Sequence, residues 1–214
     1  MRGSIANAHS FASFLLGPKG KLDERTRRGL ESILRSTGRA LEQARAVFDS
    51  LRLEVGQLAL EGEVQPVAPL LEQAVELCAA TVERSRLQVH IPLDLPWAKV
   101  DSEGLVLATR AFLHHGASRG LSTGAVTLEA LQLPEKIYVG VSDCGPSLSA
   151  VEHAQAYDRD HRVVREHGLR EGFYLSVAKD YLEAMGGEVG SCEGPAGRTF
   201  FFTLPSVDAR PPVS

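Results

Sequence analysis

The chain has 214 residues, a formal net charge of −4 and 43% hydrophobic residues, which is enough apolar material for one or two folded domains. The weakly acidic balance argues against a nucleic-acid surface, and no apolar run approaches the roughly 18 residues that a membrane span requires. Cys78, Cys144 and Cys192 are few, odd in number and widely spaced, so we expect reduced thiols in a cytoplasmic protein and no metal-binding motif.

Residues 1–58 predict a helical hairpin. A short apolar stripe at helical spacing consists of Ile5, Ala8, Ala12, Leu15 and Leu16. Gly17-Pro18-Lys19-Gly20 then breaks the helix, and a longer stripe begins near Leu22. This second stripe consists of Leu30, Ile33, Leu34, Thr37, Leu41, Ala44, Val47, Phe48, Leu51 and Val55. One short helix cannot bury it. We therefore expect residues 1–58 to pair with a second copy in an intermolecular four-helix bundle, which makes the chain a homodimer. The alternative is one long surface helix packed on its own domain.

Strands and helices then alternate along the chain. The expected elements are a strand over 56–62, a helix from Pro69, a strand over 88–93 that Pro92 places at an edge or end, a helix capped by Asp101 or Ser102, and strands over 125–133 and 136–142 around a Pro134-Glu135 turn. Residues 151–167 are polar and weakly periodic, so we expect a loop there.

The stretch from Gly168 to Gly187 predicts a glycine-marked loop followed by an amphipathic helix. A loop just ahead of a helix is a common place to bind phosphate, because free N–H groups and the helix dipole point at the anion. Gly186-Gly187 should stop this helix. Two strands over 188–193 and 198–204 follow, and residues 206–214 are expected to be a frayed, flexible tail. The whole order predicts an α+β fold, a helical hairpin followed by an α/β sandwich.

Two motifs give this order a family likeness. Val141-Ser-Asp-Cys-Gly-Pro146 resembles the adenine-binding motif of bacterial sensor histidine kinases, and the residues from Gly197 to Pro205 resemble the closing hairpin of the same family. By this resemblance, residues 1–58 correspond to the dimerisation and histidine-phosphotransfer hairpin. Residues 64–205 correspond to the ATP-binding domain.

The resemblance assigns residues of the adenine motif one by one. Asp143 matches the carboxylate that accepts a hydrogen bond from the adenine amino group, and Gly145 matches a glycine that lets the backbone approach the ring. The next glycine of the motif is Ser147 in this chain. A carboxylate and one glycine at a strand end are also ordinary turn chemistry.

The positions that should bind Mg²⁺ are altered. In the best register, the family's metal-binding asparagine falls on His115, and the polar residue four positions earlier falls on Ala111. Mg²⁺ prefers hard oxygen ligands, so an imidazole is a poor replacement and alanine contributes nothing. His114 and His115 point to different helix faces, and we expect one semi-buried and one solvated histidine.

The phosphate loop of the family falls on residues 170–175. Gly172 remains, but Arg170 and Tyr174 replace glycines, and Glu171 adds negative charge where a polyphosphate would lie. We therefore predict that ATP with Mg²⁺ does not bind productively and that the chain uses no cofactor. Whether Tyr174 fills the pocket or another ligand binds there stays open.

A phosphoacceptor histidine is a separate question. The stretch Arg2-Gly-Ser-Ile5 resembles the end of the family's His-Glu-x-Arg-x-Pro-Leu box, which would place the acceptor two positions before Met1. His9 is the one histidine in the hairpin. It lies on the first apolar stripe and has no acidic residue after it, so a packed or interface histidine is favoured over an acceptor.

Three functions remain. The first is a non-catalytic, kinase-like signalling adaptor that binds a response-regulator receiver domain or a sensor kinase. The second is a histidine phosphotransferase that relays phosphate to or from a receiver domain through His9. The third, an active kinase fragment, ranks last because Tyr174 and His115 would lie where ATP and its metal must go. The sequence does not identify the partner or the signal.

Overall fold

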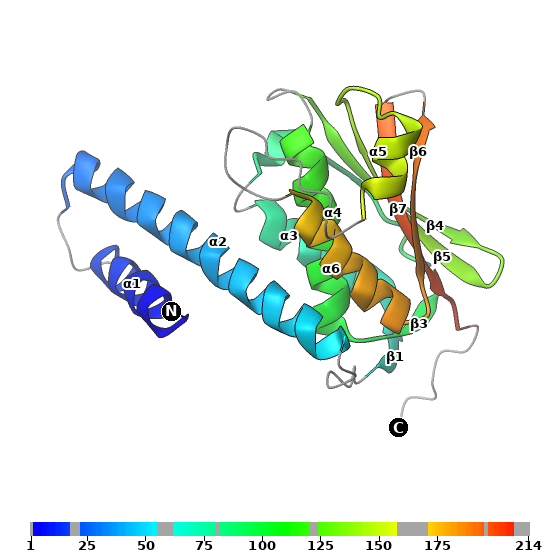
Figure 1. Cartoon of the computed structure of the whole chain (residues 1–214), viewed down its shortest axis with the longest axis horizontal. Coiled ribbons are helices and arrows are strands. Elements are labelled where there is room, and N and C mark those ends of the chain that lie inside the picture. The colour runs from blue at the N-terminus through cyan, green and yellow to red at the C-terminus, as the bar shows by residue number, and fades with distance from the viewer. Residues whose placement is uncertain are drawn as a thin grey trace. The chain divides into compact units, whose positions relative to one another are not determined.

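The computed structural model describes residues 2–17, 22–54, 62–79, 82–119, 124–157, 171–194 and 197–207. The chain divides into two compact units, Met1–Leu58 and Ala59–Ser214. Together they give an α+β fold, in which an N-terminal helical hairpin is followed by a mixed α/β sandwich (Figure 1). No helix in the described ranges is long and apolar enough to cross a membrane.

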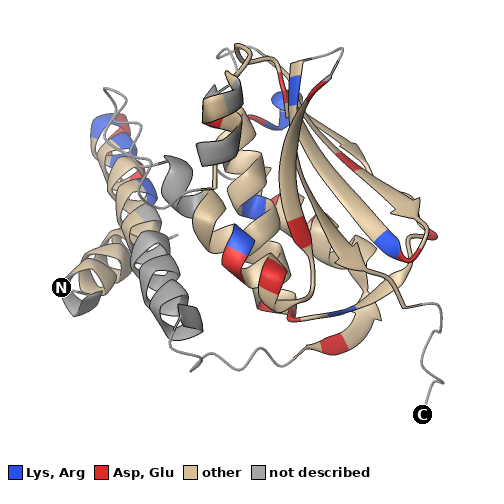
Figure 2. Ribbon diagram, turned by 45° about the vertical axis from the view of Figure 1, so that its right-hand side comes forward, with Lys and Arg blue, Asp and Glu red and all other residues tan. Residues whose placement is uncertain are grey.

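The first unit contains the predicted hairpin, α1 (Arg2–Leu15) and α2 (Glu24–Glu54). Asp23 caps α2, because its Oδ1 accepts a hydrogen bond from the Thr26 N–H at 2.9 Å and its Oδ2 accepts one from the Thr26 hydroxyl at 2.5 Å. These bonds, the side-chain one first, hold the pKa of Asp23 below its usual value. Acidic and basic residues both occur along the described part of α2 (Figure 2), and Arg28 is paired with Glu24 at 3.0 Å.

Helix α1 has two apolar faces rather than one. Ala12 is buried, and His9 on the same face contacts α2. Phe11 and Phe14 lie on the other face and are 69% and 80% exposed. Of the predicted stripe, Leu15, which is 41% exposed, and Ala8, which is also exposed, are left uncovered within one chain. Steps of three and four residues fit either face, so spacing alone did not separate them.

The second unit contains the sandwich. Its elements in chain order are β1 (Glu63–Pro66), α3 (Val67–Ala79), a short 3₁₀ helix (Arg84–Arg86), β2 (Leu87–His90), β3 (Trp97–Val100), α4 (Ser102–Arg119), β4 (Val126–Leu133), β5 (Lys136–Asp143), α5 (Ala150–Gln155), α6 (Glu171–Ala184), β6 (Glu188–Gly194) and β7 (Gly197–Pro205).

Five of these strands form one sheet in the order β2-β4-β5-β7-β6, and β1 pairs with β3 in a separate antiparallel ribbon. The β2–β4 pair is parallel and the other pairs of the large sheet are antiparallel. Helices α3, α4 and α6 lie against one face of this sheet (Figure 1). Every second residue of β5 and β7 is buried in that core: Ile137, Val139, Val141, Phe200, Phe202 and Leu204.

The predicted β4–β5 turn and the predicted end of α6 are confirmed, whereas residues 18–20 of the predicted turn after α1 lie outside the described ranges. The β4–β5 hairpin closes through Pro134 and Glu135, with Glu135 at a φ of 57°. Gly186 stops α6 at a φ of 78°, where the Gly187 N–H donates to the Leu182 carbonyl at 2.8 Å and the Gly186 N–H donates to the Glu183 carbonyl at 2.9 Å. This is a Schellman motif, which needs a left-handed residue at Gly186.

Some expectations differ from the structure. The strand expected over 56–62 lies outside the described residues except for Gly62, and β1 begins one residue later. Strand β3 was not predicted. The prediction of a loop over 151–167 was wrong for 151–155, which form most of α5. Ser149 and Glu152 make a capping box that starts this helix despite the weak periodicity. Residues 158–167 lie outside the described ranges.

The three thiols are expected to react at very different rates. Cys78 is fully buried, and burial raises its pKa to about 11, whereas Cys144 and Cys192 are exposed. Because the thiolate is the reactive form, a disulfide reagent at pH 8 should modify two thiols of the native protein quickly and the third only after denaturation. A Cys78→Ala variant serves as the control and should show two fast thiols and no slow one. Three fast thiols in the native chain would contradict the buried position of Cys78.

Candidate functional site

Asp143, the residue matched to adenine recognition, ends β5 beneath α4. Its side chain is 1% exposed, and its Oδ1 accepts a hydrogen bond from the Gly145 N–H at 2.7 Å. A side-chain carbon added to Gly116 of α4 would lie 3.7 Å from the Asp143 Cβ, so the helix passes closely over the strand end. Asp143 therefore closes a local turn in the core. Of the other motif residues, Gly145 is half-buried and Ser147 is exposed.

Arg198 lies directly across the sheet from Asp143, as its partner in the β5–β7 register. It is 0% exposed and is among the largest fully buried side chains of the described residues. Its Nη2 donates to the Pro146 carbonyl, its Nε lies 3.5 Å from a Glu193 carboxylate oxygen, and its guanidinium carbon lies 5.8 Å from the Phe200 ring centroid. A large cation thus occupies the core beside the carboxylate.

Gly197 holds the start of β7 against this strand end. It has a φ of 127°, and an added Cβ would lie 2.1 Å from the Asp143 carbonyl oxygen. Only glycine fits such an approach, since any side chain would overlap the backbone of β5. The backbone at Gly197 therefore fixes where the neighbouring Arg198 enters the core.

His115, the residue at the metal position, packs among aromatic rings. It is 7% exposed and meets Phe200 edge to face at 4.5 Å. Tyr157 lies 6.2 Å from Phe200 and 6.1 Å from Phe112, which itself lies 5.3 Å from Phe202. Ala111, the other altered position, is 6% exposed in the same helix. The expected contrast with His114 holds in part, since His114 is half-buried rather than solvated.

The segment after the adenine motif is fastened to the edge strand β6. His153 of α5 has its Nδ1 2.6 Å from the Ser191 hydroxyl and its Nε2 3.3 Å from Glu193. The Tyr157 hydroxyl donates to the Gly190 carbonyl at 2.6 Å, and burial raises the pKa of this phenol far above its usual value. These contacts hold residues 149–157 on β6, close to Phe200.

Glu193 joins several of these contacts. Loss of hydration raises its pKa, but hydrogen bonds from the Leu148 N–H and from His153, with the charge of Arg198, outweigh this effect and leave the pKa below its usual value. The carboxylate is therefore ionised at neutral pH. It links α5, β6 and the guanidinium of Arg198.

The predicted phosphate loop is only partly described. Arg170 lies outside the described residues, whereas Gly172 and Tyr174 have helical backbone in the first turn of α6. The expectation of a loop reaching residue 175 was therefore wrong for 171–174. A non-glycine residue at position 174 favours helix over loop, and Glu171 is favourable at a helix N-terminus.

Arg198 is the residue of this region that sequence reasoning missed. It has the same strand parity as Phe200, Phe202 and Leu204, so the period-two pattern alone places it on the buried face. In the described parts of the chain, no group of three His, Cys, Asp or Glu side chains could hold a metal ion.

Comparison with known proteins finds similarity to sensory proteins. No family model matches it. It is 30% identical over 122 residues to the adaptive-response sensory kinase SasA of Microcystis aeruginosa, covering 55% of this chain and 32% of that protein. It is 28% identical over 196 residues to the sensor protein DivL of Caulobacter vibrioides, covering 90% of this chain and 25% of that protein. The chain thus spans a third or less of these relatives.

Solved structures of low identity share the fold. The full-length ShkA structure in complex with AMPPNP matches with a TM-score of 0.70 and 22% identity, over 99% of this chain and 45% of that one. The histidine kinase AdeS of Acinetobacter baumannii matches with a TM-score of 0.62 and 13% identity, over 98% of this chain and 96% of that one. Both alignments span the hairpin and the sandwich.

Proposed function

We propose that this chain, a sensor histidine kinase-like protein of two-component signalling, is an adaptor that does not use ATP. It would act as a homodimer through residues 1–58 and bind a response-regulator receiver domain or a sensor kinase. The fold is that of histidine kinases, whereas several residues that ATP and Mg²⁺ would need are replaced, among them those at positions 111, 115 and 174.

The buried position of Arg198 carries this proposal. A guanidinium removed from water needs hydrogen-bond and charge partners, and in the described residues the Pro146 carbonyl accepts a hydrogen bond from Nη2 and Glu193 lies 3.5 Å from Nε, whereas Nε and Nη1 have no hydrogen-bond partner there. The cation is therefore a fixed part of the core beside Asp143, the residue that an adenine ring would have to reach. His115 supports the same proposal, because its imidazole has no oxygen that could bind Mg²⁺ and its ring packs on Phe200.

The geometry of His9 weighs against the phosphotransferase alternative. Its Nδ1 lies 3.0 Å from the Thr37 hydroxyl of α2, and its Cε1 would lie 3.5 Å from a side-chain carbon added to Gly38. The histidine therefore faces the partner helix within the hairpin. A phosphoacceptor has to face an incoming aspartyl phosphate on the outside of the bundle.

Phosphotransfer from receiver domains separates the two functions. The chain is incubated with a panel of phosphorylated receiver domains from the organism that encodes it, and binding is measured in parallel by surface plasmon resonance. The adaptor predicts saturable binding to at least one receiver domain or sensor kinase, with no phosphate on this chain. His9→Ala and Thr37→Val variants are matched, because both remove the His9–Thr37 hydrogen bond and only the first removes the imidazole.

Each outcome decides between the functions. Transfer to the wild type and to Thr37→Val, but not to His9→Ala, would replace the adaptor with a relay. If the chain binds no receiver domain and no sensor kinase, the adaptor proposal is rejected as well.

A further inference from the structure

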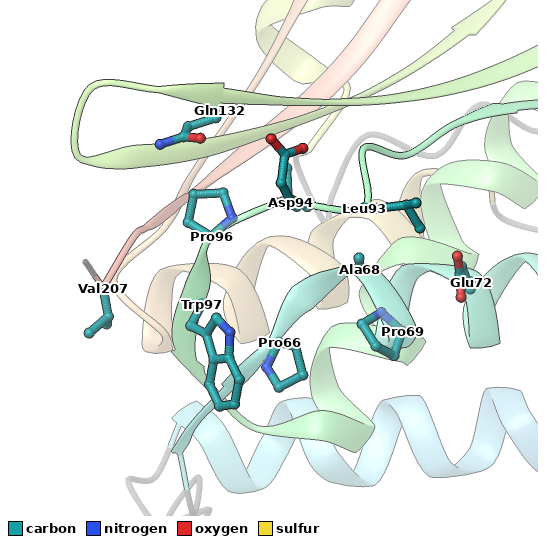
Figure 3. Close-up of a pocket in the computed structure, with 11 residues that line it drawn as sticks. Pro66, Ala68, Pro69, Glu72, Leu93, Asp94, Pro96, Trp97, Gln132 and Val207 are labelled. Atoms are coloured by element: carbon teal, nitrogen blue, oxygen red, sulfur yellow. The ribbon is translucent and has the colours of Figure 1, made fainter. Parts of the chain in front are cut away.

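A pocket of about 590 Å³ lies in the sandwich unit and shares no lining residue with the nucleotide-site positions (Figure 3). Part of its wall is Pro66, Pro69, Pro96 and the half-buried Trp97, with Pro66 opposite Trp97 in the β1–β3 register. A wall of prolines and an indole is the kind of surface that binds proline-rich extended segments.

The charge of the pocket is acidic. Glu72 and Asp94 are both exposed and are the charged residues among those that line it, with no lysine or arginine in the lining. Leu93, on the same side of the pocket as Pro69 in Figure 3, is 98% exposed, more than any other large hydrophobic residue in the described ranges. An occupant should therefore combine a cation with an apolar segment.

The chain itself leads into this pocket. After β7, the Ser206 N–H donates to the Glu135 carbonyl at 2.9 Å, and the Val207 N–H donates to the Trp97 carbonyl at 2.7 Å. Val207 and Trp97 form an antiparallel bridge, and Val207 is a lining residue of the pocket. At Val207 the chain therefore runs antiparallel to the segment that leads back from Trp97 toward Asp94.

The sequence after Val207 has the chemistry that the pocket requires. It reads Asp208-Ala-Arg-Pro-Pro-Val-Ser214. Arg210 is three residues beyond Val207, and Asp94 is three residues before Trp97, so the antiparallel direction carries the cation to the carboxylate. Three extended residues span roughly 10 Å. Pro211-Pro212 would then reach the end of the pocket at Leu93, and their fixed φ keeps the cost of ordering them low.

We propose that residues 208–213 of this chain occupy the pocket in cis, with Arg210 against Asp94 and Glu72 and with Pro211-Pro212 on Leu93 and Pro69. The tail covers the exposed apolar surface of the sandwich. A partner can bind this surface only when it displaces the tail.

Peptide binding tests this arrangement. A chain that ends at Val207 is titrated with a fluorescein-labelled peptide of residues 208–214 at low ionic strength, and anisotropy is recorded. The truncated chain binds the peptide saturably. The intact chain binds it at least about tenfold more weakly, because a tethered tail competes at millimolar effective concentration. The single tryptophan, Trp97, gives an independent readout through acrylamide quenching, which rises on truncation and falls again when unlabelled peptide is added.

Charge exchange gives the specific control. An Arg210→Glu peptide binds about three- to tenfold more weakly, as does the wild-type peptide to Asp94→Arg protein, and combining the two changes restores binding. Glu72→Lys weakens binding, whereas Glu76→Lys, one turn further along α3 and outside the pocket, does not. Equal peptide binding by the intact and truncated chains, or no rescue by the charge exchange, overturns the proposal. The proposal is also overturned if the intact chain excludes the peptide and shields Trp97 from acrylamide at high protein concentration but not after dilution. The occupant of the pocket would then be the tail of a second copy.

Discussion

Titration with ATP and Mg²⁺ in a calorimeter is expected to give no saturable binding by this chain at nucleotide concentrations up to about 1 mM, which limits any binding free energy to roughly 4 kcal/mol. We expect this result because of two features of the described residues around Asp143 and His115. The guanidinium of Arg198 is buried beside Asp143 and bonded to the Pro146 carbonyl. The His115 ring, at the metal position, packs on Phe200.

Replacing Arg198 separates these two features. An Arg198→Ser variant removes the cation and leaves room beside Asp143, so we expect weak adenosine binding, with a dissociation constant near about 1 mM. Addition of Mg²⁺ should not strengthen the binding of ATP to this variant, because His115 and Ala111 still supply no oxygen ligand. The lost contacts with Pro146 and Glu193 should lower the free energy of unfolding by about 1–3 kcal/mol, measured by chemical denaturation.

A matched control uses another cation of the same sheet. Lys136→Ser removes an exposed ion pair with Glu188, 2.9 Å long, and should change neither nucleotide binding nor, by more than about 0.5 kcal/mol, stability. Saturable Mg-ATP binding by the wild type would contradict the proposal that the chain does not use ATP, and would support an active kinase instead. The outcome for adenosine decides separately whether Arg198 blocks the site.

Much of the fold was predictable because local patterns agreed with the tertiary structure. The glycine pair Gly186-Gly187 stops α6 as expected, since the left-handed conformation at Gly186 is a local requirement. Asp101 caps α4 through the Gly104 N–H at 2.7 Å, again as expected. Hairpins with two-residue turns fix their own register, so β4 and β5 followed from the Pro134-Glu135 turn.

What escaped prediction depends on contacts between distant segments. Strand β3 has only four residues, and each of them pairs with a residue of β1 that lies more than thirty positions earlier in the chain, as Val100 does with Glu63. Arginine is usually a surface residue, and only the strand parity and the 0% exposure of Arg198 show that it belongs to the core. The replaced residues in the sequence indicate that the nucleotide site is altered, whereas the position of Arg198 beside Asp143 becomes known only from the three-dimensional structure.

The second large effect is expected in the hairpin. A Phe11→Ser, Phe14→Ser double variant should be monomeric at protein concentrations at which we expect the wild type to form the proposed dimer, as measured by sedimentation equilibrium. The two rings are 69% and 80% exposed within the chain, and Ile33 of α2 is 46% exposed. Apolar groups that one chain leaves uncovered are buried when two hairpins pair in a bundle. Burial of a phenylalanine contributes about 1.5–3 kcal/mol, so the loss of two should raise the dimer dissociation constant at least about 100-fold.

The position of these rings makes the test specific. They lie on the face of α1 opposite the buried Ala12 and the His9–Thr37 contact, so their replacement should leave the packing of α1 on α2 intact and the helix content by circular dichroism unchanged. Leu133→Ser removes an apolar side chain that is 41% exposed in the sandwich unit and should leave the dimer unaffected. A double variant that still dimerises would place the interface elsewhere, and a monomeric wild type would exclude the bundle. If dissociation also abolishes receiver-domain binding, the partner recognises the assembled bundle, because no single hairpin presents both halves of such a surface.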